Sequence, residues 1–187
     1  MFHCKDNLSG INGVLRPGIV HRIDKDTTGA LIICKNDYSH NFISQQLKVH
    51  SITRKYVGIV QGRFDETEGV IDAPIGRHPN NRKQMCINKK NGKPAVTHYK
   101  VLKQLDKYAF MEFQLETGRT HQIRVHMEHI GHPIIGDELY GFVDENLIKR
   151  QALHAYSLKF RQPRTKELLE FKADIPEDMK MLIQKLK

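Results

Sequence analysis

A change in apolar spacing at Gly118 divides the stretch Tyr108-Ala-Phe-Met-Glu-Phe-Gln-Leu-Glu-Thr-Gly-Arg-Thr-His-Gln-Ile-Arg-Val-His126. Before the glycine, apolar residues stand at every second position, which is the spacing of a strand with one buried face. After it they recur at steps of three and four, which predicts a helix over Thr120–Ile130. Glycine suits the tight turn between the two elements. The stretch therefore predicts a strand, a turn and a helix around one core.

Strand patterns dominate the rest of the chain, and few helices separate them. A polar loop is expected over Arg77–Lys93, and helices over Tyr38–Val49 and after Pro176. No regular alternation of strands and helices and no glycine-rich phosphate loop is visible, so a Rossmann or P-loop enzyme is not indicated. We predict an α+β fold with a mixed, mostly antiparallel sheet flanked by helices. The further strands are expected at Ala30–Lys35, Thr53–Val60, Ala95–Leu105, Ala152–Arg161 and Glu167–Ala173.

The chain is basic and has the size of one domain. Its 187 residues contain 30 Lys and Arg against 21 Asp and Glu, a formal charge of +9. Such an excess favours a polyanionic partner, which can be a nucleic acid or an acidic membrane surface. A soluble protein that happens to be basic is the alternative.

Neither a membrane span nor a disulfide framework is indicated. The longest apolar run, Ala30–Cys34, is too short to cross a bilayer. The three cysteines are widely spaced and form no CxxC pair. We expect a monomer in a reducing cytoplasm.

Acidic, basic and hydroxyl side chains gather just before the predicted strand at Ala30, within Pro17-Gly-Ile-Val-His-Arg-Ile-Asp-Lys-Asp-Thr-Thr-Gly29. Asp24 and Asp26 are both candidates for a nucleophile or a general base. Asp26 could instead form a turn with the threonines that follow it. The whole stretch could also be a turn with solvated charges, and spacing alone does not separate the two acids.

Arg119 falls on the apolar face of the predicted helix, in register with Ile123 and Met127. A buried guanidinium keeps its proton and needs an anionic partner, which a nearby aspartate would supply through a bidentate pair. The alternative is an arginine that extends its charged end to solvent.

Tyr56 follows two basic residues in Arg54-Lys-Tyr56, and Gly58 leaves space beside its ring. A ring with basic neighbours and free space suits stacking of a nucleobase, although many strand tyrosines are core residues. The histidines 121, 126, 129 and 132 allow a zinc hydrolase as a rival interpretation. They lack the HExxH pattern, so we expect no metal.

Together these motifs resemble the RluA-type pseudouridine synthases, most closely the RluD-like branch. The resemblance runs from Ile11 to Pro163 in the family's order and spacing. The matching motifs are His21-Arg-Ile-Asp-Lys-Asp-Thr-Thr-Gly29, Arg54-Lys-Tyr56, Pro74-Ile-Gly-Arg-His-Pro79, Gly92-Lys-Pro-Ala95, Thr117-Gly-Arg-Thr-His-Gln-Ile-Arg124, Gly131-His-Pro-Ile-Ile-Gly-Asp137 and Leu153-His-Ala155.

The resemblance implies the pseudouridine synthase catalytic fold, with an active-site cleft on the sheet and no cofactor or metal. It implies that Asp24 is the catalytic carboxylate, that Arg119 pairs with it and that Tyr56 stacks on the target base. Arg22 matches a residue that displaces the base. The implied reaction isomerises uridine to pseudouridine in RNA, chiefly large-subunit ribosomal RNA. We expect RNA contacts from His21, Arg22, Arg54, Arg77, Arg82, Lys83, His121 and Arg124.

The chain departs from the family pattern at its start. Family members carry an upstream strand with an Asn-Lys-Pro-x-Gly motif, and many carry an S4-like RNA-binding domain. Neither precedes Ile11, so we expect residues 1–187 to form an N-terminally incomplete catalytic domain. A catalytically silent RNA-binding module is therefore the alternative function.

Overall fold

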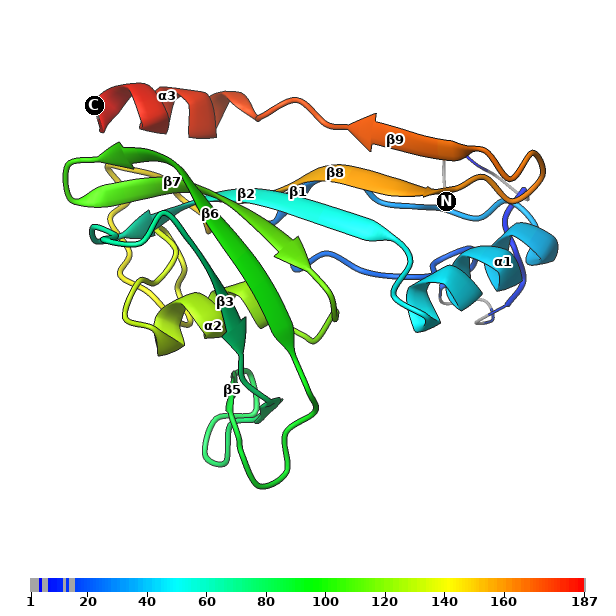
Figure 1. The fold of residues 1–187 in the computed structure, drawn as a ribbon, viewed down its shortest axis with the longest axis horizontal. Helices are drawn as coiled ribbons and strands as arrows, with labels where there is room; N and C mark the ends of the chain where they lie inside the picture. The colour runs from blue at the N-terminus through cyan, green and yellow to red at the C-terminus, as the bar shows by residue number, and fades with distance from the viewer. Residues whose placement is uncertain (1–3, 5–6, 12, 14–15, 187) are drawn as a thin grey trace.

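The computed structural model describes residues 4, 7–11, 13 and 16–186. Within them, seven strands form one mixed sheet in the order β1-β8-β2-β7-β6-β3, and β9 also pairs with β8 (Figure 1). Only the β1–β8 pair is parallel. The strands are β1 (Thr28–Gly29), β2 (Thr53–Gln61), β3 (Glu68–Asp72), β6 (Val96–Leu105), β7 (Tyr108–Leu115), β8 (Leu153–Arg161) and β9 (Leu168–Lys172).

In the described part of the chain, three helices flank this sheet: α1 (Asp37–Lys48), α2 (Gln122–His129) and α3 (Glu177–Lys185). In Figure 1, α2 and α3 lie on opposite sides of the strands. Both faces of β2 are covered at its centre, because every residue from Tyr56 to Val60 is buried. The α+β architecture predicted from the sequence is confirmed.

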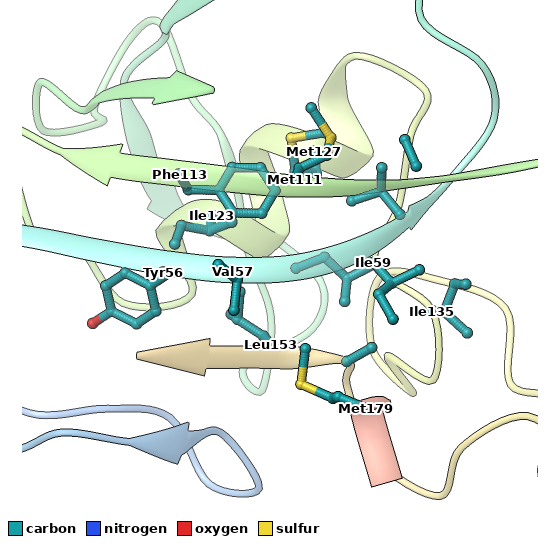
Figure 2. Close-up of a cluster of buried hydrophobic side chains, with 14 of the residues drawn as sticks. Tyr56, Val57, Ile59, Met111, Phe113, Ile123, Met127, Ile135, Leu153 and Met179 are labelled. Carbon is teal, nitrogen blue, oxygen red and sulfur yellow. The ribbon is translucent and has the colours of Figure 1, made fainter. Parts of the chain in front are cut away.

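The core forms where β2, β7 and β8 meet the two covering helices (Figure 2). Met111 and Phe113 of β7 are fully buried, as the two-residue spacing of that stretch predicts. Met127 of α2 and Met179 of α3 belong to the same cluster. Each such side chain contributes roughly 1.5–3 kcal/mol by leaving water. This packing fixes the strands whose ends carry the polar motifs.

The predicted strand at Ala30–Lys35 is wrong. Only Thr28 and Gly29 pair as a strand, and a single bridge joins Ile33 to Ile19. Leu31 and Ile33 are exposed by 38% and 39%. Cys34 is buried in a small separate cluster, and Ile32 packs against that cluster, so only part of this apolar run reaches a core. A short apolar run is compatible with a buried strand, but its residues alone do not supply a neighbouring strand to pair with.

The predicted polar loop over Arg77–Lys93 contains a small hairpin of its own. β4 (Ile75–Arg77) pairs antiparallel with β5 (Met85–Ile87), and the hairpin projects from the main sheet in Figure 1. Ile75 is buried in a separate cluster with Ala95 and Val125. These short strands were not predicted because their few apolar residues stand among many charged and polar ones in the sequence.

Candidate active site

A cleft of about 510 Å³ lies between the segment at residues 20–27, the C-terminal half of α1 and the segment at residues 118–124. It brings together residues that are up to 133 positions apart in the sequence, from Val20 to Leu153. Of the acidic side chains among the described residues, only Asp24 lines it. Its polar and charged lining includes His21, Arg22, Asp24, Lys48, Arg54, Tyr56, Arg119, His121 and Arg124.

Asp24 begins a tight turn that the rest of the fold holds from two directions. The amide of Thr27 donates to the Asp24 carbonyl at 3.1 Å, and Asp26 adopts a positive φ of 67°. Gln151 donates to the Thr27 hydroxyl at 3.1 Å. Arg150 donates to the Asp26 carbonyl at 3.3 Å and binds Asp178 of α3 through two bonds of 2.8 Å. The turn that carries Asp24 is therefore fixed to β8 and α3.

Gly29 lets this turn lie flat against β8. Its φ is 116°, and a Cβ atom there would stand 2.2 Å from the carbonyl oxygen of Ala155. A larger residue would push the segment away from its parallel partner strand. The glycine that ends the first motif thus sets the position of Asp24.

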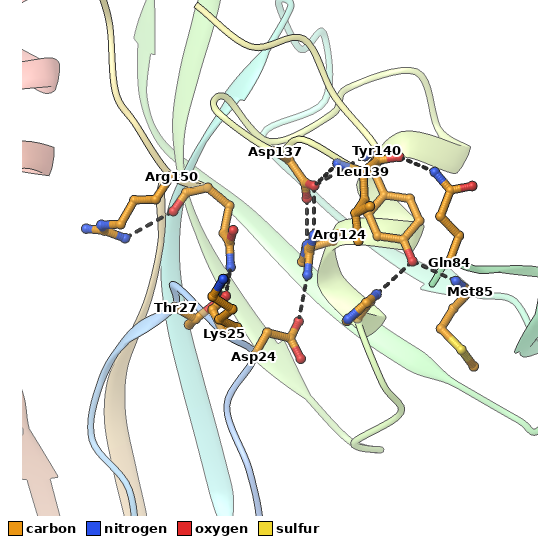
Figure 3. Close-up of polar contacts among 12 residues, drawn as sticks. Asp24, Lys25, Thr27, Gln84, Met85, Arg124, Asp137, Leu139, Tyr140 and Arg150 are labelled. Atoms are coloured by element: carbon orange, nitrogen blue, oxygen red, sulfur yellow. Dashed lines mark hydrogen bonds and ion pairs between the residues drawn. The ribbon is translucent and has the colours of Figure 1, made fainter. Parts of the chain in front are cut away.

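Arg124 is the partner of Asp24 (Figure 3). Its Nη1 lies 3.4 Å from Asp24 Oδ2, while Nε and Nη2 donate to the two oxygens of Asp137 at 2.6 and 2.8 Å. The side chains of Arg124 and Asp137 are 6% and 0% exposed, and that of Asp24 is 15% exposed. Asp137 therefore orients the guanidinium, which in turn meets the catalytic candidate at the cleft.

Burial lowers the pKa of Arg124, but the hydrogen bonds and charges of Asp137 and Asp24 outweigh burial and raise it overall. The guanidinium accordingly stays charged and presents a fixed positive charge at the cleft. Asp137 Oδ1 also accepts from the amides of Leu139 and Tyr140. This buried aspartate has no outward-facing role, and it anchors the arginine.

The predicted pairing of Arg119 with Asp24 is wrong. Arg119 is half-buried, and its Nε donates to the carbonyl of Pro94 at 2.9 Å. The helix begins only at Gln122, after His121 in a left-handed conformation with φ 56°. Helical spacing therefore cannot be extended back to Arg119, although its side chain still lines the cleft.

Arg124, a predicted RNA contact, is buried and reaches the cleft only as part of its lining. Every residue of α2 from Gln122 to Met127 is buried, so this short helix has no solvent face over most of its length. The apolar stripe marks one buried face only, because a helix enclosed on all sides also buries polar residues that find partners. Arg124 and Gln122 lie outside the apolar stripe of α2, so the helical pattern predicts that they face solvent, but both are buried.

Tyr56 lies in the cleft wall with a residual exposure of 9%. Burial raises the pKa of its hydroxyl, the charge of Arg54 lowers it, and the charge of Asp24 raises it. The net shift is upward, so the ring is a neutral phenol at neutral pH. A neutral ring beside an ionised carboxylate can stack on a planar base.

His21 has a structural task at the cleft rim. Its Nε2 accepts the amide of Ile32 at 2.9 Å, which requires an unprotonated nitrogen. Burial and the nearby charge of Arg54 lower its pKa to about 4. The neutral ring therefore does not supply the positive charge that an RNA-binding role was expected to use.

His121 and Tyr140 connect the cleft to the β4–β5 hairpin. The Tyr140 hydroxyl accepts the amide of Met85 at 2.7 Å and is hydrogen-bonded to Nδ1 of His121 at 2.8 Å. Burial lowers the pKa of His121, an effect to which the charges of Arg124 and Arg22 add and which Asp24 and Asp137 oppose. The guanidinium of Arg124 also lies 5.1 Å from the centre of the Tyr140 ring. Tyr140 is a residue that the sequence patterns did not single out.

Arg54 lies on the same face of β2 as Tyr56 and is 8% exposed. Its Nη2 donates to the carbonyl of Glu116 at 3.2 Å, and its buried Nε has no hydrogen-bond partner. A Cβ atom at Gly118 would stand 2.4 Å from Nη1, so that glycine makes room for the guanidinium. Arg22, by contrast, is an exposed part of the cleft rim.

The remaining predicted RNA contacts, Arg77, Arg82 and Lys83, are exposed on the β4–β5 hairpin and its connecting loop. The histidines do not gather into one cluster. His126 is a fully buried residue, and its two ring nitrogens are hydrogen-bonded to the Thr97 hydroxyl and the Ala73 carbonyl. Among the residues that the structure describes, no group of three or more His, Cys, Asp or Glu side chains could hold a metal.

In the described part of the chain, no helix has the length and apolar character needed to cross a bilayer.

Comparison with protein families gives a match over residues 4–129 to the family described as RNA pseudouridylate synthase. An uncharacterized RNA pseudouridine synthase, YlyB of Bacillus subtilis (strain 168), is 52% identical over 187 residues. Ribosomal large subunit pseudouridine synthase D of Zymomonas mobilis is 45% identical over 195 residues. Each alignment includes 100% of this chain and 61% of the relative, so the chain spans less than two thirds of their length.

Two solved human structures share the fold. RNA Pseudouridylate Synthase Domain Containing 1 aligns with a TM-score of 0.73 and 28% identity, over 89% of this chain and 78% of that one. RNA Pseudouridylate Synthase Domain Containing 4 aligns with a TM-score of 0.74 over 94% and 78% of the two chains, and its 24% identity supports likeness of fold alone.

Proposed function

We propose that this chain, which belongs to the RNA pseudouridylate synthase family, isomerises uridine to pseudouridine in RNA with Asp24 as the catalytic carboxylate. Its similarity to relatives of the D type agrees with the predicted RluD-like branch. One observation carries the proposal: Asp24 stands in a cleft beside Tyr56, held by a buried arginine that a second aspartate orients.

The proposed reaction is an isomerisation, so the substrate gains and loses no atom overall. The N1–C1′ bond of uridine breaks and a C5–C1′ bond forms, while C5 loses a proton and N1 gains one. Asp24 supplies the carboxylate that acts on the ribose, and the contact with Nη1 of Arg124 orients it. Tyr56 is protonated at neutral pH, because its pKa is raised, so we assign it to stacking on the base rather than to removal of the C5 proton.

The base must leave its stack before it can rotate, which costs a few kcal/mol. Arg22 at the exposed rim is placed to fill the space that the base vacates, and Arg119 within the cleft to contact the displaced nucleotide. The cations of the β4–β5 hairpin, Arg77, Arg82 and Lys83, are proposed phosphate contacts. This arrangement spreads RNA binding over the cleft and the hairpin.

Large-subunit ribosomal RNA is the proposed substrate, supported by the names of several relatives. Such a substrate places the protein in the cytoplasm. Mapping of pseudouridines in ribosomal RNA from cells with and without the gene tests this choice. A site that persists unchanged in the absence of the gene has another source.

Release of tritium from RNA labelled at uridine C5 tests the activity itself. The wild type should release tritium, and Asp24→Asn should reduce the rate at least about 100-fold, because a positioned catalytic group is lost. Asp26→Asn is the matched control, since asparagine tolerates a positive φ and Asp26 stands outside the cleft lining. It should keep a rate close to that of the wild type.

A catalytically silent RNA-binding module is the second candidate. It would bind RNA and release no tritium in any variant. Release that is equal in the wild type and Asp24→Asn would remove Asp24 from the mechanism.

A further inference from the structure

Arg54 is a buried cation without an acidic partner. Its side chain is over nine-tenths buried, yet none of the ion pairs among the described residues includes it. One backbone carbonyl accepts from Nη2, and the Nε–H is left without an acceptor. Burying a guanidinium without an anionic partner costs free energy. An apolar side chain could fill the same space without that cost.

The cleft itself offers no free carboxylate to Arg54, so an anionic partner would have to come from a ligand. Arg22, Lys48, Arg54, Arg119 and Arg124 line the cleft, against the single carboxylate of Asp24. Arg124 is already engaged by Asp137 and Asp24. The lining therefore keeps a positive excess after its internal pair is satisfied, and it favours a negatively charged occupant.

The position of Arg54 relative to Tyr56 selects the part of the substrate. The two residues are separated by two steps along β2 and face the same side, so their Cα atoms are roughly 7 Å apart. A base stacked on Tyr56 with its ribose at Asp24 leaves the sugar–phosphate backbone as the anionic group within reach. Arginine is well suited to a phosphate because its planar fork donates two parallel bonds.

We propose that Arg54 forms a phosphate subsite inside the cleft, which binds the backbone phosphate adjacent to the uridine held at Tyr56 and Asp24. The proposal rests on the proposed function, since the phosphate belongs to the substrate RNA. Gly118 belongs to the subsite as well, because any side chain there would collide with the guanidinium. The motif glycine thus serves an arginine that lies 64 residues earlier in the chain.

Binding of small ligands to the full chain tests this without any need for turnover. Uridine, uridine 5′-monophosphate and uridine 3′-monophosphate are titrated separately and followed by NMR. The wild type should bind one of the monophosphates at least about 10-fold more tightly than uridine, as expected for a charge-assisted bond. In Arg54→Met this preference should fall to near unity, while uridine affinity stays the same.

Arg63→Met is the matched control. It removes the same charge beyond the opposite end of β2, from an exposed side chain, and should keep the wild-type preference. Arg54→Lys should keep part of the preference, because it retains the charge and loses the fork.

A second measurement on the wild type covers the case in which Arg54→Met fails to fold. The Nε–H signal of Arg54 should shift on addition of the preferred monophosphate and remain in place with uridine. Absence of any monophosphate preference in the wild type, an unchanged preference in Arg54→Met, or equal weakening of uridine and monophosphate would each overturn the subsite. Because these readouts measure binding, failure of catalysis alone leaves them intact.

Discussion

Arg124 divides one guanidinium between two carboxylates, and lysine cannot reproduce that geometry. We expect Arg124→Lys to lower the free energy of unfolding by about 2 kcal/mol, because a bidentate bond to fully buried Asp137 is lost. Turnover should fall as well, since Asp24 loses its fixed partner. Denaturant unfolding and the tritium assay measure the two effects.

Arg119→Lys is the comparison that separates the two arginines. Arg119 gives one hydrogen bond to a carbonyl and is half-buried, so its replacement should change the free energy of unfolding by less than about 1 kcal/mol. An equal loss of stability in both variants would mean that the Asp137 pair is not what Arg124 contributes.

His21 gives stability a pH dependence. Its pKa is about 4 in the folded chain and near 6.5 when unfolded, so between these values the unfolded chain binds a proton that the folded chain does not. Its contribution is complete above pH 6.5 and decreases by ~1.4 kcal/mol per pH unit as the pH falls toward 4. Thermal unfolding from pH 7 to 4 measures this, with His21→Gln as the variant. If both proteins lose stability with the same slope, other groups cause the effect.

The sequence predicts which residues line the cleft better than it predicts which of them form pairs. Asp24 and Tyr56 both line the cleft, as their motifs indicate. Arg119 and Arg124 lie in the same motif, and the choice between them depends on where α2 begins. One left-handed residue, His121, shifts that start, and no residue type makes such a conformation obvious in advance.

The Tyr140 hydroxyl is one link between the β4–β5 hairpin and the candidate active site, beside the packing of Ile75 against Val125. Tyr140→Phe removes the acceptor of the Met85 amide and the hydroxyl that is hydrogen-bonded to His121. We expect faster amide hydrogen exchange at Met85 and its strand neighbours, because removal of this bond costs roughly 1–3 kcal/mol locally. RNA affinity should fall with it.

Tyr156→Phe on β8 is a control for loss of a hydroxyl elsewhere, and its hairpin exchange should match the wild type. Unchanged exchange in Tyr140→Phe would show that the Gln84 bond to Leu139 is sufficient to hold the hairpin.

Elements with one buried face are the ones that the sequence predicts well. β7 and α3 follow their expected spacing closely, with Met111 and Phe113 or Met179 and Leu182 facing the core. The spacing rule is ambiguous for α2, which is buried along most of its length, and for the run Leu31–Ile33, in which Leu31 and Ile33 are exposed. The strand β3 was not predicted. It pairs with β6 at the edge of the sheet, and most of its residues are exposed, so it lacks a clear apolar pattern.

The formal charge of +9 should make RNA binding strongly dependent on salt. The slope of log affinity against log salt concentration reflects the number of neutralised phosphates. Replacing Arg77, Arg82 and Lys83 by glutamine together should reduce that slope by about one for each phosphate that the variant no longer neutralises. Filter binding to ribosomal RNA at several salt concentrations measures it.

A triple glutamine variant of Arg63, Lys103 and Lys107 removes the same charge from exposed positions around the β6–β7 turn. Its slope should remain that of the wild type. Equal slopes for both triple variants would indicate that net charge, rather than the hairpin, governs RNA binding.

The global architecture was accessible from the sequence because family motifs and strand patterns agree. The mixed sheet and the cleft on it follow from many short segments in a fixed order. Among the described strands, one pair is parallel, β1 with β8, and it joins segments more than 120 residues apart. The spacing of apolar residues within each segment does not predict this pairing.

Arg150 ties the carbonyl of Asp26 to Asp178 at the start of α3. Synthesis proceeds from the N-terminus, so Arg150 and Asp178 are added to the chain 126 and 154 residues after Asp24. Until then, the turn that carries Asp24 lacks the partners that hold it in the folded protein. Its position is therefore complete only after α3 has been made and has docked.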